Sequence, residues 1–216
     1  MSDEQTEAGG QGETRARLLC AAERLYAEHG ISAVSNRQIS KEAGLGNNYA
    51  VGIHFGSHVE LIREILTMHN RRLDEYRSAA LTSLGYISDL RDWLRCMVAP
   101  HVEYLYALGV PCHFARFCVQ VTTDPTVSEL VLHAGVVDSK PLAETVAGLY
   151  RVLPMMPTDV LDARSAFTRH LLLHSLADVE RTLNDTAGSP LEVREQVDIF
   201  VDALVGIWLA PITSET

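Results

Sequence analysis

The chain has 216 residues, 47% of them apolar, and a net charge of −10. This length and composition allow a continuous buried core in one large domain or two small ones. No stretch approaches the roughly 18 uninterrupted apolar residues of a spanning helix, and the N-terminus lacks the basic and apolar regions of a secretion signal. We therefore expect a soluble cytoplasmic protein without a membrane partner.

The four cysteines are Cys20, Cys96, Cys112 and Cys118. They lie in apolar helical patterns and form no CxxC pair, which favours buried free thiols over disulfides or a zinc site.

The acidic charge is unevenly distributed along the chain. Residues 13–72 hold eight Lys/Arg against six Asp/Glu, whereas residues 73–216 hold ten against nineteen. Because phosphate neutralisation dominates DNA affinity, a nucleic-acid partner is compatible with the N-terminal part and not with the acidic remainder. The remainder would repel DNA and so help to orient the N-terminal part.

Helical periodicity begins near residue 14. The preceding residues 1–13 are polar and acidic and predict a disordered tail. Apolar residues at helical spacing predict a helix over 14–29, which Gly30 ends in a left-handed conformation. Ser35 or Asn36 can then cap a short second helix.

The second helix is predicted to stop at the glycine-containing turn 44–46. A third short segment covers 47–53. Ser57 can cap the next helix with Glu60 as its capping-box partner, and that helix continues to about residue 80.

Beyond residue 80 the pattern stays helical, and no period-2 alternation predicts a strand. Prolines and cap residues mark the breaks. The predicted helices cover 86–108, 111–122, 125–134, 139–152, 158–184 and 190–210. Pro100 lies inside the first of these and is expected to kink it. The predicted fold class is all-α.

Two short helices joined by a glycine-containing turn, with a longer helix behind them, form the arrangement that sets a recognition helix into the major groove. The run NRQISKEAGLGNNYAVGIHFGSHVELI resembles the TetR family of bacterial transcriptional regulators. The matching positions are Leu18, Ala21, Ala22, Leu25, Gly30, Ile39, Ser40, Ala43, Gly44, His54, Phe55, Ser57 and Leu61. The resemblance covers residues 15–66.

Three departures from the family pattern bear on DNA binding. The stretch from Ala43 to Phe55 has one residue more than the commonest members, an Asn-Asn variant of the turn and recognition helix. Gly52 and Ile53 stand where the family usually has a phosphate-contacting tyrosine, and His58 replaces its usual lysine. A neutral histidine gives up one phosphate charge, so binding should be weaker or depend more on base contacts.

The resemblance implies a set of DNA-contacting residues: Asn47, Asn48 and Tyr49 facing the groove, and Arg37, His54 and His58 beside the phosphate backbone. Asparagine amides can pair with adenine, and arginine suits guanine or phosphate. Structural roles are the alternative. Asn47 and Asn48 can cap the short helix, Tyr49 can fill the small core, and His54 can hydrogen-bond across the helices.

The resemblance also implies a domain organisation: a helix-turn-helix DNA-binding domain over 14–57, a connecting helix over 58–80 and a helical ligand-binding and dimerisation domain over 81–216. A single helix-turn-helix reads few bases, so such domains act in pairs on a pseudo-palindromic site of double-stranded DNA. We therefore expect a homodimer.

The last two long helices are the best candidates for the dimer interface, because the family's final helices form an intersubunit four-helix bundle. The interface predicted from their apolar faces consists of Leu172, Leu176, Val179, Val197, Val201, Leu204 and Trp208. Ordinary intrachain core is the alternative for these residues.

The middle helices carry the mixture of aromatic and polar residues that suits a small-molecule cavity. The predicted pocket for an effector consists of Trp93, Met97, His101, Tyr104, His113, Phe114, Phe117, Cys118 and Val121. Plain helical core is again the alternative. Together with the resemblance, the pattern favours a bulky, largely apolar ligand whose binding shifts the protein to a form that releases DNA.

His170, His174 and Asp178 recur every four residues, a spacing that can chelate a divalent metal, although the surrounding leucines favour polar or partner-facing contacts. We predict no metal and no cofactor. Because the sequence shows no nucleophile-base pair, phosphate loop or paired catalytic carboxylates, we expect no catalytic residues and no enzyme.

The leading hypothesis is a homodimeric, ligand-responsive repressor. The alternatives are an activator, a regulator that responds to a protein partner, and an all-helical small-molecule carrier or enzyme.

Overall fold

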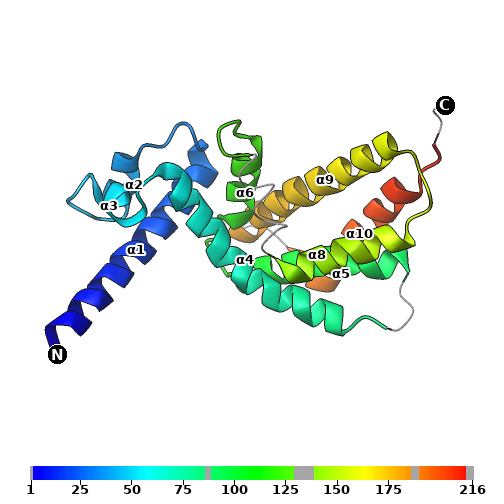
Figure 1. Cartoon of the computed structure of the whole chain (residues 1–216), viewed down its shortest axis with the longest axis horizontal. Coiled ribbons are helices and arrows are strands. Elements are labelled where there is room, and N and C mark those ends of the chain that lie inside the picture. The colour runs from blue at the N-terminus through cyan, green and yellow to red at the C-terminus, as the bar shows by residue number, and fades with distance from the viewer. Residues whose placement is uncertain (1, 86–88, 129–138, 186–189, 213–216) are drawn as a thin grey trace. The chain divides into compact units, whose positions relative to one another are not determined.

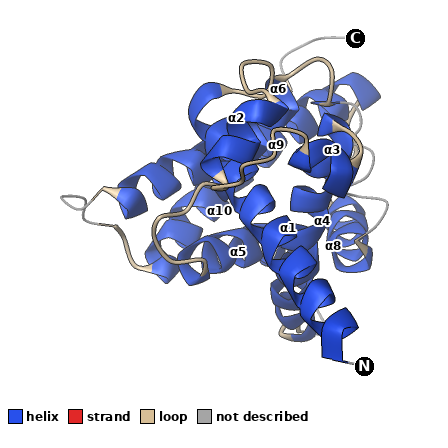
Figure 2. Cartoon of the chain, turned by 90° about the vertical axis from the view of Figure 1, so that its left-hand side faces the viewer, coloured by secondary structure: helices blue, strands red, loops and turns tan. Residues whose placement is uncertain are grey.

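The computed structural model describes residues 2–85, 89–128, 139–185 and 190–212, with side chains from residue 10 onward. Every regular element in these ranges is a helix, as Figure 2 shows, which confirms the all-α prediction. The described residues form two compact units. The first unit draws on 1–69 and 116–133, and the second on 70–115 and 134–216.

The first unit contains the short helices of the helix-turn-helix (Figure 1). Its elements are α1 (Ser2–His29), α2 (Asn36–Glu42), α3 (Ala50–Phe55), the start of α4 (His58–Thr82) and most of α6 (Phe114–Thr123). Leu18 and Tyr26 of α1, Ile39 of α2, Val51 of α3 and Leu61 of α4 are all fully buried. One small apolar core therefore holds the short helices in place.

Helix α1 begins at Ser2, whereas the sequence predicted a disordered tail over 1–13. Residues 10–13 are exposed, so this part of the helix packs on nothing. Elongating an already formed helix costs much less free energy than nucleating one, and Glu, Gln and Ala are good helix formers. The packed part of α1 can therefore propagate toward the N-terminus.

Part of α6 completes the core of the first unit. The ring of Phe117 stacks on Tyr26 with 6.0 Å between centroids. Just after the helix, the Asp124 carboxylate accepts a hydrogen bond from the Ser32 hydroxyl at 2.6 Å. Periodicity within residues 14–57 could not show that this core needs a later helix, so the described units differ from the predicted division of the chain.

The second unit is a bundle of longer helices (Figure 1). Its elements are the remainder of α4, α5 (Leu90–Ala107), α8 (Lys140–Val152), α9 (Thr158–Asn184) and α10 (Val193–Leu209). Helix α5 packs against α8, α9 and α10. Gly148 of α8 lies against Trp93 of α5 so closely that an added Cβ would be 2.2 Å from the indole ring. A side chain at position 148 would therefore force the two helices to repack.

The predicted helix 158–184 agrees with α9 at both ends, and 139–152 agrees with α8 to within one residue. The other later helices start inside their predicted ranges. Most of the helix predicted over 125–134 lies outside the described residues.

All four cysteines are free thiols, but Cys20 is exposed, which corrects the prediction that all would be buried. None of the described helices has the length and apolar character needed to cross a membrane.

Candidate DNA-binding surface

Helix α2 is fixed at both ends. The Ser35 hydroxyl accepts from the Gln38 backbone N–H at 3.3 Å, and the Gln38 side chain accepts from the Ser35 N–H at 2.8 Å, forming a capping box. At the other end Gly44 adopts a φ of 68°, a left-handed conformation that favours glycine. The Arg17 guanidinium of α1 donates to the Ala43 carbonyl beside it.

Helix α3 is attached through Arg15 of α1. The Arg15 guanidinium donates to the His54 carbonyl at 2.7 Å, lies 4.4 Å from the centroid of the Phe55 ring and pairs with Glu64 of α4 at 2.8 Å. Ala50, Val51 and Phe55 of α3 are buried. A charged group of α1 that contacts two other helices limits how α3 can move, and precise reading of base edges needs a rigid support.

The predicted groove-facing residues are exposed but precede the helix. Asn47, Asn48 and Tyr49 lie before α3, and Tyr49 keeps 80% of its surface accessible. The sequence predicted a helix over 47–53, yet the structure starts it at Ala50. The Asn47 side-chain oxygen accepts from the Tyr49 N–H at 2.9 Å, a turn in which the side chain competes with the helix. The side-chain oxygen of Asn47 is therefore used in a hydrogen bond within the chain, while the side chains of Asn48 and Tyr49 are exposed.

The three predicted backbone contacts differ in their environments. Arg37 is exposed in the first turn of α2. His54 is half-buried, with its ring 6.4 Å from that of Phe55. Of these three, Arg37 carries the accessible permanent charge.

His58 is turned toward the core of the first unit. Its Nδ1 lies 3.2 Å from the Tyr26 hydroxyl and 3.4 Å from the Asn36 side-chain oxygen, and its ring meets Tyr26 edge-on at 5.0 Å. Burial lowers the pKa of His58, although the Asp124 charge opposes this. A half-buried imidazole with internal partners has a packing role in the first unit, and its predicted place beside the phosphate backbone stays a prediction.

Sequence reasoning missed Ile53. This side chain is 68% exposed on α3, one turn after Tyr49, whereas Val51 and Phe55 face the core. Gly52 lies beside it, also exposed. A glycine within a helix costs about 1 kcal/mol relative to alanine. The available signal was an isoleucine four residues from Tyr49, on the face opposite the apolar residues of the short helix.

The predicted effector-pocket residues divide between the two units. Phe117, Cys118 and Val121 belong to the first unit, where Phe117 and Val121 are buried. The other six belong to the second unit: Trp93, Met97, His101, Tyr104, His113 and Phe114. A pocket shared by all nine stays a prediction.

Aromatic side chains cluster in the second unit. The ring of Tyr104 meets those of Tyr76 and Phe114 edge-on, with centroids 5.7 and 5.9 Å away. The Arg151 guanidinium lies 5.7 Å from the Trp93 ring.

A buried polar network lies next to this aromatic cluster. The Arg77 guanidinium donates to Asp74 at 2.7 Å and lies 3.3 Å from Nε2 of His101, while the Ser139 hydroxyl donates to Asp74 at 2.6 Å. Nδ1 of His101 lies 2.7 Å from the Met97 carbonyl. His101 thus has one nitrogen facing a carbonyl and the other facing a cation, the arrangement of a neutral ring that donates at Nδ1 and accepts at Nε2.

Burial, assisted by the Arg77 charge, lowers the pKa of His101 from 6.5 to about 3. Between these values the unfolded chain binds a proton at this site that the folded chain does not, so stability falls as pH decreases from about 6.5 toward 3. We expect His101→Gln to reduce this dependence by up to about 1.4 kcal/mol per pH unit, the limit for one proton. Urea unfolding at several pH values measures it, and equal slopes in both proteins would contradict the assignment.

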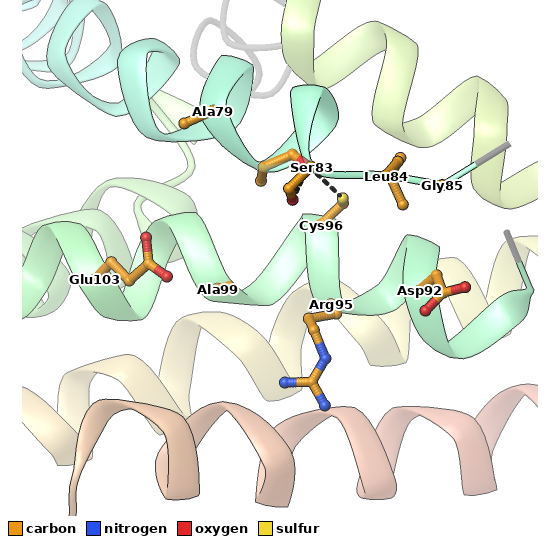
Figure 3. Close-up of a pocket in the computed structure, with 10 residues that line it drawn as sticks. Ala79, Ser83, Leu84, Gly85, Asp92, Arg95, Cys96, Ala99 and Glu103 are labelled. Carbon is orange, nitrogen blue, oxygen red and sulfur yellow. Dashed lines mark hydrogen bonds between the residues drawn. The ribbon is translucent and has the colours of Figure 1, made fainter.

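The second unit has a cavity of about 440 Å³ between α4 and α5 (Figure 3). It is lined by Ala79, Ala80, Ser83, Leu84, Gly85, Asp92, Arg95, Cys96, Ala99 and Glu103, none of which was predicted. The Cys96 thiol donates to the Ala80 carbonyl at 3.4 Å, and burial raises its pKa to about 11. Arg95 pairs with Asp198 of α10 at 2.5 Å. An unreactive thiol and a paired arginine leave this cavity without evident chemistry.

The predicted dimer residues are buried within the chain itself. Leu172, Leu176, Val179, Val197, Val201, Leu204 and Trp208 each keep 9% or less of their surface. A periodic pattern shows that a helix face is buried, but not whether the same chain or a partner covers it. In this structure the chain itself covers it. Their burial favours the intrachain alternative, and their place in a dimer interface stays a prediction. The large apolar side chains exposed on α9 and α10 are Phe167, Ile199 and Leu209.

His170, His174 and Asp178 are exposed on α9, and Asp178 pairs with Arg181 one turn later. Over the described ranges, no three His, Cys, Asp or Glu side chains are grouped closely enough to hold a metal ion.

Comparison with solved structures identifies the fold. No protein-family model matches the sequence, and no curated protein matches it significantly. A TetR-family transcription regulator from Marinobacter aquaeolei is 19% identical, with 91% of this chain and 97% of the other covered and a TM-score of 0.59. NalD of Pseudomonas aeruginosa, the secondary repressor of the MexAB-OprM multidrug efflux pump, is 19% identical over 93% and 99% of the two chains (TM-score 0.54).

PfmR, a TetR-family regulator of Thermus thermophilus, is 18% identical over 92% and 97% of the two chains (TM-score 0.52). In each case the match spans both the helix-turn-helix and the helical bundle. The chain therefore has the fold of the TetR-family transcriptional regulators.

Proposed function

We propose that this chain is a homodimeric DNA-binding transcriptional regulator, most simply a repressor that a bulky, largely apolar small molecule releases from a pseudo-palindromic operator. The observation that carries the proposal is the exposed surface of Asn48, Tyr49 and Ile53, held on a helix-turn-helix by Arg15. These three side chains are exposed and do not contribute to the buried core of the first unit. A regulator of this kind acts in the cytoplasm, where the operator lies.

Charge supports the orientation of this surface toward DNA. Arg37 and Lys41 are exposed on α2, the helix that packs against α3. The rest of the protein is acidic, so its repulsion from phosphate disfavours other docking modes. The repressor role follows by analogy with NalD, a repressor of a multidrug efflux pump with the same fold. The responsiveness to a largely apolar compound is inferred from the aromatic residues of the second unit.

The effector would bind among the aromatic and polar residues of the second unit. Trp93, Met97 and His101 are half-buried side chains of α5, and Tyr104 adds a ring to the same helix. Because His101 is neutral and its Nε2 faces Arg77, which pairs with Asp74, this region combines a polar network with aromatic side chains.

A gel shift with the DNA that flanks the chain's own gene, repeated with candidate lipophilic metabolites, tests the proposal. We expect a salt-sensitive shift that one class of metabolite reverses. Absence of a shift on every flanking fragment would contradict DNA binding. A shift that no metabolite reverses, on a promoter that the protein activates, would favour the activator alternative.

The homodimer would form through the outer faces of α9 and α10. Phe167 on α9 and Ile199 and Leu209 on α10 are exposed, and Ala203 and Gly206 would allow close approach of the α10 backbones. Exposed apolar side chains on the surface of a bundle mark interaction sites when they are contiguous.

We expect Ile199→Glu to convert the dimer to a monomer, because a buried, unpaired carboxylate at a symmetric interface is repeated in both subunits. Light scattering coupled to size-exclusion chromatography measures the change. Met155→Glu is the control, since Met155 is fully exposed before α9. A dimer that persists in the Ile199→Glu protein would rule out this face.

A further inference from the structure

The outer face of α3 differs in composition from an ordinary solvent-exposed helix face. Gly52 and Ile53 of α3, together with its flanking residues Tyr49 and Gly56, recur at three- and four-residue spacing, and all four are exposed. The face therefore carries two large apolar side chains and two glycines, with no charged residue among them. Solvent-facing helical positions normally carry charged or polar side chains.

Tyr49 and Ile53 are unusual within their unit. Among the described side chains of the first unit, they are the only large apolar ones classed as exposed, at 80% and 68%. The Ile53 N–H donates to the Tyr49 carbonyl at 3.0 Å, so the two side chains leave the backbone one helical turn apart. Such a pair forms a single apolar patch.

Gly52 lies between these side chains and has no role in the chain's own packing. A Cβ built on Gly52 would meet no atom within 4 Å. Its φ is not in the left-handed region, unlike those of Gly44 and Gly56. Neither internal crowding nor backbone conformation therefore explains a helix-weakening glycine here, which leaves the close approach of an external surface as its physical reason.

We propose that Ile53 reads the C5-methyl group of a thymine in the major groove and that Gly52 lets the α3 backbone approach the base edges closely enough for this contact. The inference rests on the proposed function. The thymine methyl is the apolar feature of the base edges in that groove, and an aliphatic side chain is its natural partner. The exposed cations Arg37 and Lys41 lie on α2, which packs against α3, and would attract the phosphates that flank the bases.

The test removes the methyl group from the DNA and the side chain from the protein in a double-mutant cycle. An operator is first selected from random double-stranded DNA by the full chain, and each thymine is then replaced by deoxyuridine. Wild-type protein should lose about fourfold in affinity at one thymine of a half-site, equivalent to about 0.8 kcal/mol for one buried methyl group. Ile53→Ala should bind both DNAs equally at that position, whereas Met155→Ala should behave as wild type.

Each outcome of the cycle has one meaning. Selection of no DNA would contradict the proposed function itself. If an operator is selected, two results would overturn the inference but not the proposed function. Either wild type and Ile53→Ala lose the same affinity on deoxyuridine substitution, or no thymine substitution changes the affinity.

Gly52→Ala tests the close approach separately. Alanine favours the helix, so the variant should unfold at an equal or higher temperature while binding the selected operator at least about tenfold more weakly, because its methyl group repeats in both half-sites. Unchanged affinity would show that nothing approaches Gly52 closely.

Discussion

Tyr49→Ala and Asn48→Ala should each abolish operator binding under conditions where the wild-type protein is half-saturated. Both side chains are exposed, so their truncation removes no internal packing. A good base contact is worth about 1–3 kcal/mol, and a symmetric dimer makes it in both half-sites, so the expected loss is about thirtyfold or more. Fluorescence anisotropy with a labelled operator measures the affinity.

Thermal unfolding of the same two variants is the necessary companion measurement, and both should match wild type within about 0.5 kcal/mol, as exposed substitutions usually do. Met155→Ala provides an exposed substitution outside the proposed surface. If both variants at positions 48 and 49 bind the operator with wild-type affinity, the DNA-reading surface lies elsewhere.

Arg164→Met should cause a large loss of stability in the helical bundle. Arg164 of α9 is buried, and its guanidinium donates to the Trp208 and Ala210 carbonyls at 2.6 Å each. These carbonyls end α10, where backbone acceptors have no helical partner and the helix dipole is negative. Methionine fills the space but donates nothing, so we expect a loss of about 3 kcal/mol.

Arg169→Met is the matched control, because Arg169 lies on the same helix with its side chain exposed. The free energies of unfolding of the two variants, measured in urea, should differ by most of the loss expected for Arg164→Met. Equal stabilities would mean that water replaces the guanidinium at the end of α10 without penalty.

The sequence predicted the ends of helices best where strong local signals mark them. The predicted start of α9 at Thr158, directly after Pro157, agrees with the structure, and Ser35 and Gly44 bound α2 as predicted. These signals act through backbone conformation and short-range hydrogen bonds, which depend on neighbouring residues only. The helix-turn-helix could therefore be located from the sequence.

The start of α3 was harder to predict because two local preferences compete there. Asn47 can begin a helix or form a turn with the Tyr49 N–H, and the structure has the turn. A shift of the helix start changes which residues share its outer face. This is why the sequence prediction grouped Asn48 with Tyr49 but left out Ile53.

Residues that depend on tertiary neighbours were predicted least well. The apolar stripes of α9 and α10 were recognised as buried, but the sequence could not show that one chain covers both. His58 was interpreted as a substitute for a lysine that contacts DNA. In the structure its Nδ1 lies within hydrogen-bonding distance of Tyr26 and Asn36. Arg77, a cation beside His101, lies 24 residues away in sequence and carried no local signal.

The most direct test of the account is selection of random double-stranded DNA by the full-length protein, followed by a salt titration of binding to the enriched sequence. We expect a pseudo-palindrome with two half-sites about one helical turn apart, and an affinity that falls linearly with salt concentration on logarithmic axes. No enriched sequence, or an affinity independent of salt, would contradict it.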